Sequence, residues 1–144
     1  MHQTRFYHCR HCGNLVEVIH NAGVPIICCG EEMSPLELNG DGAAEKHLPV
    51  VRMENGTLKV RVGEIPHPME TAHYIQWIYV KTGTGSMYRY LEPGQAPEAI
   101  FSLGEGRPLA VYAYCNIHGL WMIEVQKKKK RDAPYGNAVR LVEK

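Results

Sequence analysis

Cysteine and histidine are the residues of this sequence that could bind metal ions or transfer electrons. Five cysteines are present: Cys9 and Cys12 with two residues between them, the adjacent pair Cys28 and Cys29, and Cys115 alone. An odd number does not suit a disulfide framework, and in a reducing compartment cysteines are more often metal ligands or redox groups. The spacing therefore indicates four sulfur ligands for one site and one for another.

The four cysteines near the N-terminus predict a tetrahedral metal site. A C-x2-C turn lets both thiolates face one metal, and Gly13 and Gly30, which follow the two cysteine pairs, can adopt the positive φ that such turns often need. The side chains of adjacent cysteines tend to diverge, so binding one ion distorts the site. Zinc and iron both suit four thiolates, and the ligand chemistry alone leaves iron and a purely structural zinc equally open.

Four of the eight histidines lie in the later part of the chain with its single remaining cysteine. Any one of them alone would more often be an ordinary surface or core histidine. Together they favour a second metal site, because imidazole suits iron and a thiolate is a strong donor that can stabilise the ferric state. Five such ligands leave one position of an octahedral site open for a substrate. The predicted ligands are His47, His67, His73, Cys115 and His118.

The segments that carry these residues predict an all-β protein in four parts. Residues 1–36 have little space for a core and would need a metal to hold them together. Residues 37–44 (ELNGDGAA) have the composition of a connector. Residues 45–125 contain short alternating runs separated by turn signals, which is typical of a β-sandwich. The expected strands cover residues 57–62, 73–81, 86–91, 110–114 and 120–125.

Charge is unevenly distributed along the chain of 144 residues. Residues 127–131 (KKKKR) hold five of the 16 basic residues, so the rest carries 11 positive against 15 negative charges, or −4. This balance argues against a nucleic-acid-binding surface. The basic C-terminal segment, residues 126–144, is interpreted as a solvated extension that can include one edge strand, and a binding role for its lysines is the alternative.

Two further features concern the compartment. No apolar run approaches the ~20 residues of a membrane span, and the N-terminus (MHQTRFYHCRHCG) lacks the apolar region of a signal peptide. We therefore expect a cytoplasmic protein without a membrane partner.

The N-terminal motif is specific enough to show a resemblance. Residues 7–14 (YHCRHCGN), 16–18 (VEV) and 28–31 (CCGE), with Met33 following, resemble the desulforedoxin module over nearly all of residues 1–36. The resemblance implies a distorted, rubredoxin-like iron site on the four cysteines and thereby favours iron over zinc.

The later motifs resemble a superoxide reductase domain. They are residues 45–49 (EKHLP), 67–77 (HPMETAHYIQW), 92–99 (EPGQAPEA) and 115–121 (CNIHGLW). With the desulforedoxin-like module, the whole chain up to about residue 125 resembles the desulfoferrodoxin family of two-iron superoxide reductases.

The resemblance implies an immunoglobulin-like β-sandwich and a ferrous site with four equatorial histidines and axial Cys115. It also implies reduction of superoxide to hydrogen peroxide, a homodimer, and a rubredoxin as the electron donor expected for the family. By motif match, Glu45 occupies the vacant position in the oxidised resting state. Lys46 attracts the anionic substrate and donates a hydrogen bond to it.

Two other functions are compatible with the same ligands. A superoxide dismutase would require the ferric site to oxidise superoxide, which a strongly donating thiolate disfavours. A metal protein without superoxide turnover would be an electron carrier using both irons or a structural module. Consumption of superoxide in proportion to a supplied reductant distinguishes the three.

Overall fold

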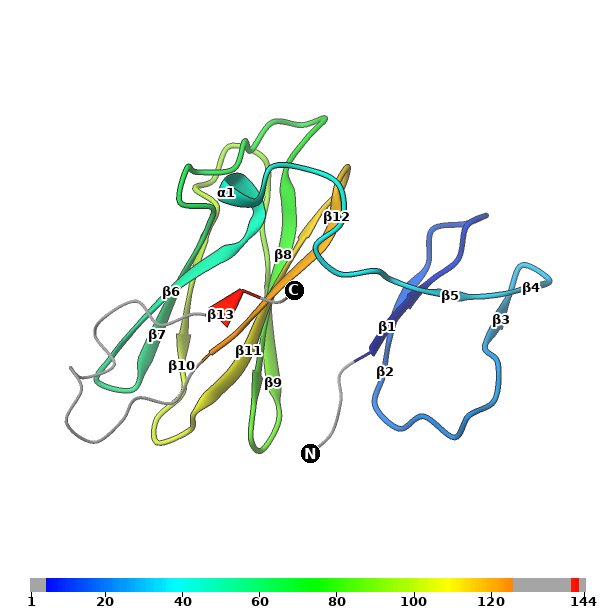
Figure 1. Cartoon of the computed structure of the whole chain (residues 1–144), viewed down its shortest axis with the longest axis horizontal. Coiled ribbons are helices and arrows are strands. Elements are labelled where there is room, and N and C mark those ends of the chain that lie inside the picture. Colours follow the sequence, from blue (N-terminus) through cyan, green and yellow to red (C-terminus); the bar gives the residue numbers. More distant parts are fainter. Residues whose placement is uncertain (1–4, 126–140, 143–144) are drawn as a thin grey trace. The chain divides into compact units, whose positions relative to one another are not determined.

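The computed structural model describes residues 5–125 and 141–142 of the chain. The chain divides into two compact units, residues 1–37 and 38–144 (Figure 1). In both units the regular secondary structure is β-strand apart from one short helix, which confirms the predicted all-β class. The predicted domain limits themselves stay predictions, because compactness does not show which part of a chain folds alone. No helix within the described ranges is long and apolar enough to cross a membrane.

The N-terminal unit has two small sheets and a minimal core. Among its described residues only Phe6, Cys9 and Met33 are buried. A core of this size does not stabilise a folded unit by itself, so a bound metal is expected to hold this unit together. One sheet, ordered β2-β1-β5, contains β1 (Arg5–His8), β2 (Leu15–Val18) and β5 (Ser34–Pro35), and a hairpin joins β3 (Ile27–Cys28) to β4 (Glu31–Glu32).

The second unit is a sandwich of two antiparallel sheets preceded by one helical turn, α1 (Ala44–His47). The smaller sheet has the order β10-β7-β6 and contains β6 (Pro49–Glu54), β7 (Thr57–Val62) and β10 (Glu98–Ser102). The larger has the order β13-β12-β11-β8-β9 and contains β8 (Ile75–Thr82), β9 (Ser86–Tyr90), β11 (Pro108–Cys115), β12 (Gly119–Glu124) and β13 (Leu141–Val142).

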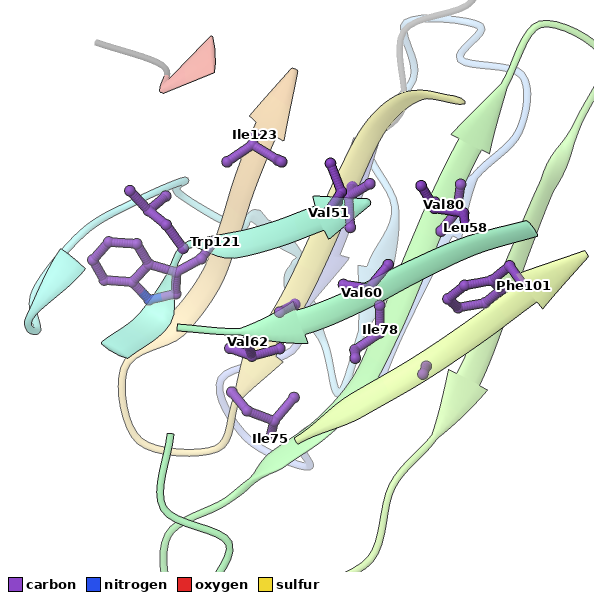
Figure 2. Packing of buried hydrophobic residues seen from close by; sticks show 14 of the residues in the cluster. Val51, Leu58, Val60, Val62, Ile75, Ile78, Val80, Phe101, Trp121 and Ile123 are labelled. Atoms are coloured by element: carbon purple, nitrogen blue, oxygen red, sulfur yellow. The ribbon is translucent and has the colours of Figure 1, made fainter. Parts of the chain in front are cut away.

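Alternation of side chains places one apolar face of each sheet toward the other. On β7, Leu58, Val60 and Val62 are buried while the residues between them are exposed, as the period of a strand requires. Figure 2 shows these side chains pointing into the space between the sheets, where they meet Ile78 and Val80 of β8. This packing fixes the strands whose ends carry the metal ligands.

A two-residue turn joins β6 to β7. Glu54 pairs with Thr57, and the residues between them, Asn55 and Gly56, have φ values of 50° and 77°. Positive φ at both central positions is the geometry of a type I′ turn, for which Asn-Gly is the preferred sequence.

Part of the predicted connector pairs with the sandwich. Leu38 forms a parallel bridge with Leu120. The side chain of Asn39 brackets Met122: the Met122 N–H donates to Asn39 Oδ1 at 2.8 Å, and Asn39 Nδ2 donates to the Met122 carbonyl at 3.3 Å. Leu120 and Met122 belong to β12, and β13 pairs with this strand. The basic run at residues 127–131 lies outside the described residues.

Candidate metal centres

The four N-terminal cysteines converge on one point. The sulfur atoms of Cys9, Cys12, Cys28 and Cys29 all lie within 4.8 Å of one another. None of them forms a disulfide, and Cys12 Sγ and Cys28 Sγ are 3.6 Å apart. This is the arrangement expected for four thiolates that share one tetrahedral ion.

Backbone geometry explains how the first pair of cysteines, Cys9 and Cys12, comes together. After β1 the chain turns at Cys9, whose N–H donates to the Asn14 carbonyl at 2.9 Å, and Gly13 reverses the direction with a φ of 85°. The N–H groups of His11 and Cys12 then point at Cys9 Sγ, at 3.4 and 3.5 Å. These two donors, that of Cys12 first, lower the pKa of Cys9 to about 6 and favour its thiolate.

The adjacent cysteines occupy a tight hairpin between β3 and β4. Cys28 pairs with Glu31, which leaves Cys29 and Gly30 at the two central positions, both with positive φ (55° and 77°). A cysteine seldom adopts this conformation, and here it directs two neighbouring sulfurs to one side. Hydrogen bonding with the side chains of Cys12 and then Cys9 raises the pKa of Cys29 to about 12. Four thiolates at this separation therefore need a cation between them, so the residues fit a metal ion.

The second cluster gathers the five residues predicted to form the histidine site. Ligand atoms of His47, His67, His73 and Cys115 lie within 4.8 Å of one another. His118 completes the set: its Nδ1 is 3.1 Å from His47 Nε2 and 3.9 Å from Cys115 Sγ.

The nitrogen separations fit ligands of one ion. His67 Nε2 lies 3.2 Å from His47 Nε2. Two nitrogens that each lie about 2.1 Å from a metal, at a right angle, are about 3.0 Å apart. The rings of His47 and His67 stand edge to face with an interplanar angle of 74°. The arrangement is therefore that of neighbouring ligands.

Two of the imidazoles are held by local backbone carbonyls. His47 Nδ1 lies 2.8 Å from the Ala43 oxygen and His67 Nδ1 lies 2.7 Å from the Pro68 oxygen, so each ring donates there and turns Nε2 toward the cluster. Such an outer hydrogen bond fixes the tautomer that a metal ligand needs. Within the described chain, the buried Nε2 of His73 has no hydrogen-bond partner. A buried nitrogen without a partner is costly unless a metal takes it.

Burial keeps these rings neutral, as metal binding requires. His47 is 3% exposed and His67 is 2% exposed. Burial lowers the pKa of His67 to about 4. It also lowers the pKa of His47, with smaller contributions from the charges of His118, His73 and Lys46. Neither ring competes for a proton near neutral pH.

A β-bulge lies in β8 where it pairs with Cys115 of β11. Along β11, Tyr114 pairs with Trp77 but Cys115 pairs with Ile75, so β8 has one extra residue at this point. The bulge turns the end of β8 so that Ile75 enters the core, and bulges commonly redirect side chains beside functional sites. Cys115 is fully buried, and the His118 N–H points at its sulfur at 3.3 Å.

Two residues without a predicted role lie beside the ligands. Trp121 stacks on His47 at 4.7 Å between ring centroids and donates its indole N–H to the His118 carbonyl at 3.1 Å. Gly42 has a φ of 126°, and a Cβ there would lie 3.0 Å from His47 Cε1 and 3.1 Å from His118 Cγ. Its only sequence signal was a place in a glycine-rich connector, which does not indicate a contact with ligands.

Glu45 and Lys46 lie on α1, directly before the ligand His47. Both side chains are exposed while His47 is buried. The one-turn helix therefore brings two opposite charges to the border of the cluster.

Comparison with known proteins agrees with both clusters. Residues 39–134 match the family model described as desulfoferrodoxin, and residues 2–36 match the one described as desulfoferrodoxin, N-terminal domain. The chain belongs to the desulfoferrodoxin family. Its four-cysteine cluster and its cluster of four histidines and one cysteine match the two iron sites of desulfoferrodoxins. The prediction of iron rather than zinc at the four-cysteine site is thereby confirmed.

Individual relatives cover most of the chain. It is 45% identical over 123 residues to the desulfoferrodoxin of Nitratidesulfovibrio vulgaris, covering 85% of this chain and 97% of the relative. It is 48% identical over 120 residues to that of Syntrophotalea carbinolica, covering 82% and 94%. The crystal structure of the superoxide reductase from Treponema pallidum superposes with a TM-score of 0.71 at 33% identity, covering 83% of this chain and 96% of the other.

Proposed function

We infer that this protein is a superoxide reductase. The observation that carries the inference is the convergence of His47, His67, His73, His118 and Cys115 on one point in a desulfoferrodoxin. In the reaction, superoxide takes up one electron and two protons and becomes hydrogen peroxide. The electron comes from a donor, so each superoxide consumes one reducing equivalent.

The four histidines and Cys115 would hold an iron ion, which would supply the electron that superoxide receives. Cys115 is a strong electron donor to that site, and the His118 N–H that points at its sulfur tempers the donation. Cys115 is fully buried, so its sulfur is shielded from solvent.

Lys46 is the residue proposed to attract the substrate. Its exposed ammonium lies on the same helical turn as His47, and its charge contributes to the lowered pKa of that histidine, after burial and the other histidines. A single nearby cation attracts superoxide, while more distant charges are screened beyond about 8 Å at physiological ionic strength. Glu45 carries the opposite charge. It is proposed to take the vacant position once peroxide has left and the site is ferric.

The decisive experiment measures stoichiometry. A known amount of superoxide is added to the pre-reduced iron-loaded protein with a supplied reductant, and oxidised reductant and peroxide are both counted. A superoxide reductase oxidises one equivalent of reductant and forms one peroxide for each superoxide. A dismutase would form half as much peroxide without using reductant, and an electron carrier would form none beyond the uncatalysed background. Either outcome would reject the proposal.

Family membership supports a proposal for the partners of this protein. We propose that a rubredoxin donates the electrons, that the protein is a homodimer, and that it works in the cytoplasm. Oxidation of a reduced rubredoxin by the ferric protein in stopped-flow mixing tests the donor. Light scattering of the iron-loaded protein tests the dimer.

A further inference from the structure

Asn116 connects two of the loops that carry metal ligands. Its side-chain oxygen accepts the N–H of Tyr74 at 2.9 Å, and its side-chain nitrogen donates to the carbonyl of Ala72 at 3.0 Å. Its own N–H donates to the Tyr74 carbonyl at 3.2 Å. The two residues that the side chain contacts lie immediately before and after His73, and Asn116 itself follows Cys115.

These contacts continue the sheet beyond its last backbone pair. The ladder between β8 and β11 ends at the bulge where Cys115 pairs with Ile75. Beyond that point the amide of Asn116 offers one acceptor and one donor to the opposite chain, as a residue of a strand would. The segment around His73 is thereby kept in register with the segment that carries Cys115.

His73 depends on its backbone more than His47 and His67 do. The rings of His47 and His67 are each oriented by a hydrogen bond from Nδ1 to a carbonyl close in sequence. For His73 no ring-to-backbone bond of this kind is found in the described part of the chain, and its Nε2 is buried without a partner. The N–H of His73 donates to the Glu70 carbonyl at 2.9 Å, and the Glu70 N–H donates to the His73 carbonyl at 3.0 Å. The position of the ring is therefore set by where residues 72–74 lie.

We propose that Asn116 is a positioning residue for the histidine site: its side chain fixes His73 relative to Cys115 and so sets the ligand geometry. The proposal deepens the proposed function, because it concerns the same site. It assigns Asn116 no contact with substrate or metal.

The chain offers a matched control in Asn39. The amide of Asn39 also accepts one backbone N–H and donates to one carbonyl, both of Met122, and its own N–H donates to the Leu120 carbonyl. Neither Met122 nor Leu120, the residues that Asn39 contacts in these bonds, is a metal ligand. Since Asn39 has a φ of 55°, alanine there also strains the backbone, so the control is expected to lose at least as much stability as Asn116→Ala.

The test compares Asn116→Ala and Asn39→Ala as full-length, iron-loaded proteins. Fe²⁺ release to a chelator is followed for each site, together with the electron paramagnetic resonance spectrum of the oxidised protein. For Asn116→Ala we expect Fe²⁺ affinity of the histidine site to fall about ten- to a hundredfold. Its ferric signal should shift, while the signal of the four-cysteine site stays unchanged. Asn39→Ala should leave Fe²⁺ affinity of the histidine site within about twofold of wild type.

Wild-type affinity and an unchanged ferric signal in Asn116→Ala would overturn the proposal, and so would equal changes in both variants. If Asn116→Ala does not fold, Asn116→Asp decides, because it keeps the acceptor for Tyr74 and loses the donor to Ala72. An intermediate loss of affinity supports the role, and none refutes it. These measurements use no superoxide, so they succeed or fail separately from the proposed activity.

Discussion

Substitutions of Glu45 and Lys46 test whether charge at single positions controls the reaction with superoxide. Both are exposed on α1 beside the buried ligand His47 and differ in sign. Lys46→Ala should slow the reaction of the ferrous site with superoxide by roughly ten- to a hundredfold, because only the cation attracts an anion. Glu45→Ala, the matched control, should leave that step nearly unchanged and alter the ferric absorption spectrum. Pulse radiolysis gives both rates.

The salt dependence of those rates separates attraction from a change in structure. Attraction by Lys46 weakens as ionic strength rises, so the difference between wild type and Lys46→Ala should shrink at high salt. Equal rates for the two proteins at low and at high salt would refute the role of Lys46.

Gly42 is a second position at which a small substitution should disturb the histidine site. Alanine there would place a Cβ 3.0 Å from His47 and 3.1 Å from His118, at a φ of 126°. We expect Gly42→Ala to displace these rings, shift the ferric spectrum and lower the free energy of unfolding by about 1 kcal/mol or more. Gly40→Ala is the control, because a Cβ at that position meets nothing within 4 Å. Identical spectra for the two variants would contradict the predicted contact.

The ligands themselves could be predicted because imidazole and thiolate groups are metal donors by residue type, whatever the fold around them. Four histidines and a cysteine within one predicted domain favour a shared metal site even where their spacing follows no short motif. The residues that position them could not be predicted in the same way. Asn116 contacts the residues that flank His73, which is distant from it in sequence. Gly42 lies beside His47 and His118 only once the chain has folded. Neither asparagine nor glycine is a residue type that indicates a metal site.

Strand bounds could be predicted where the alternation of apolar and polar residues is clear. The predicted strand at residues 57–62 has the bounds of β7, and the one at 86–91 differs from β9 by one residue. Strands β6 and β10 were not predicted. In β6 the consecutive Val50 and Val51 hide the alternation, and β10 has only five residues, among turn-forming neighbours. The bulge near Cys115 could not be predicted, because it depends on pairing between two strands.

The turn between β6 and β7 provides a test of one element. Gly56 has a φ of 77°, and a Cβ there would lie 2.8 Å from the carbonyl oxygen of Gly104. Gly56→Ala should therefore lower the free energy of unfolding by about 1 kcal/mol or more, as measured by denaturant titration. Gly85→Ala, in the turn between β8 and β9, should stay within about 0.5 kcal/mol of wild type, since a Cβ there meets nothing within 4 Å. Similar losses in both variants would show that Gly56 has no special role.

At the scale of the whole molecule, the two iron sites draw their ligands from separate units. The four cysteines lie within residues 1–37, and the four histidines with Cys115 lie within residues 38–144. The second unit has an apolar core between two sheets, whereas the described part of the first buries three residues. The first unit should therefore depend on its metal for folding, and the second should not depend on the first.

Cys9→Ser tests this independence. Cys9 is the buried cysteine of the first cluster and receives two backbone N–H groups. Its loss should remove iron from the four-cysteine site and disorder the N-terminal unit, seen as lost amide dispersion in nuclear magnetic resonance spectra. Reduction of superoxide with an artificial electron donor should largely survive, because all five ligands of the histidine site remain. Cys115→Ser is the reciprocal variant, which should lose the activity and keep the first iron. If Cys9→Ser lost most of its reactivity with superoxide while iron stayed at Cys115, the units would be coupled, and the first site would have a part in the chemistry of the second.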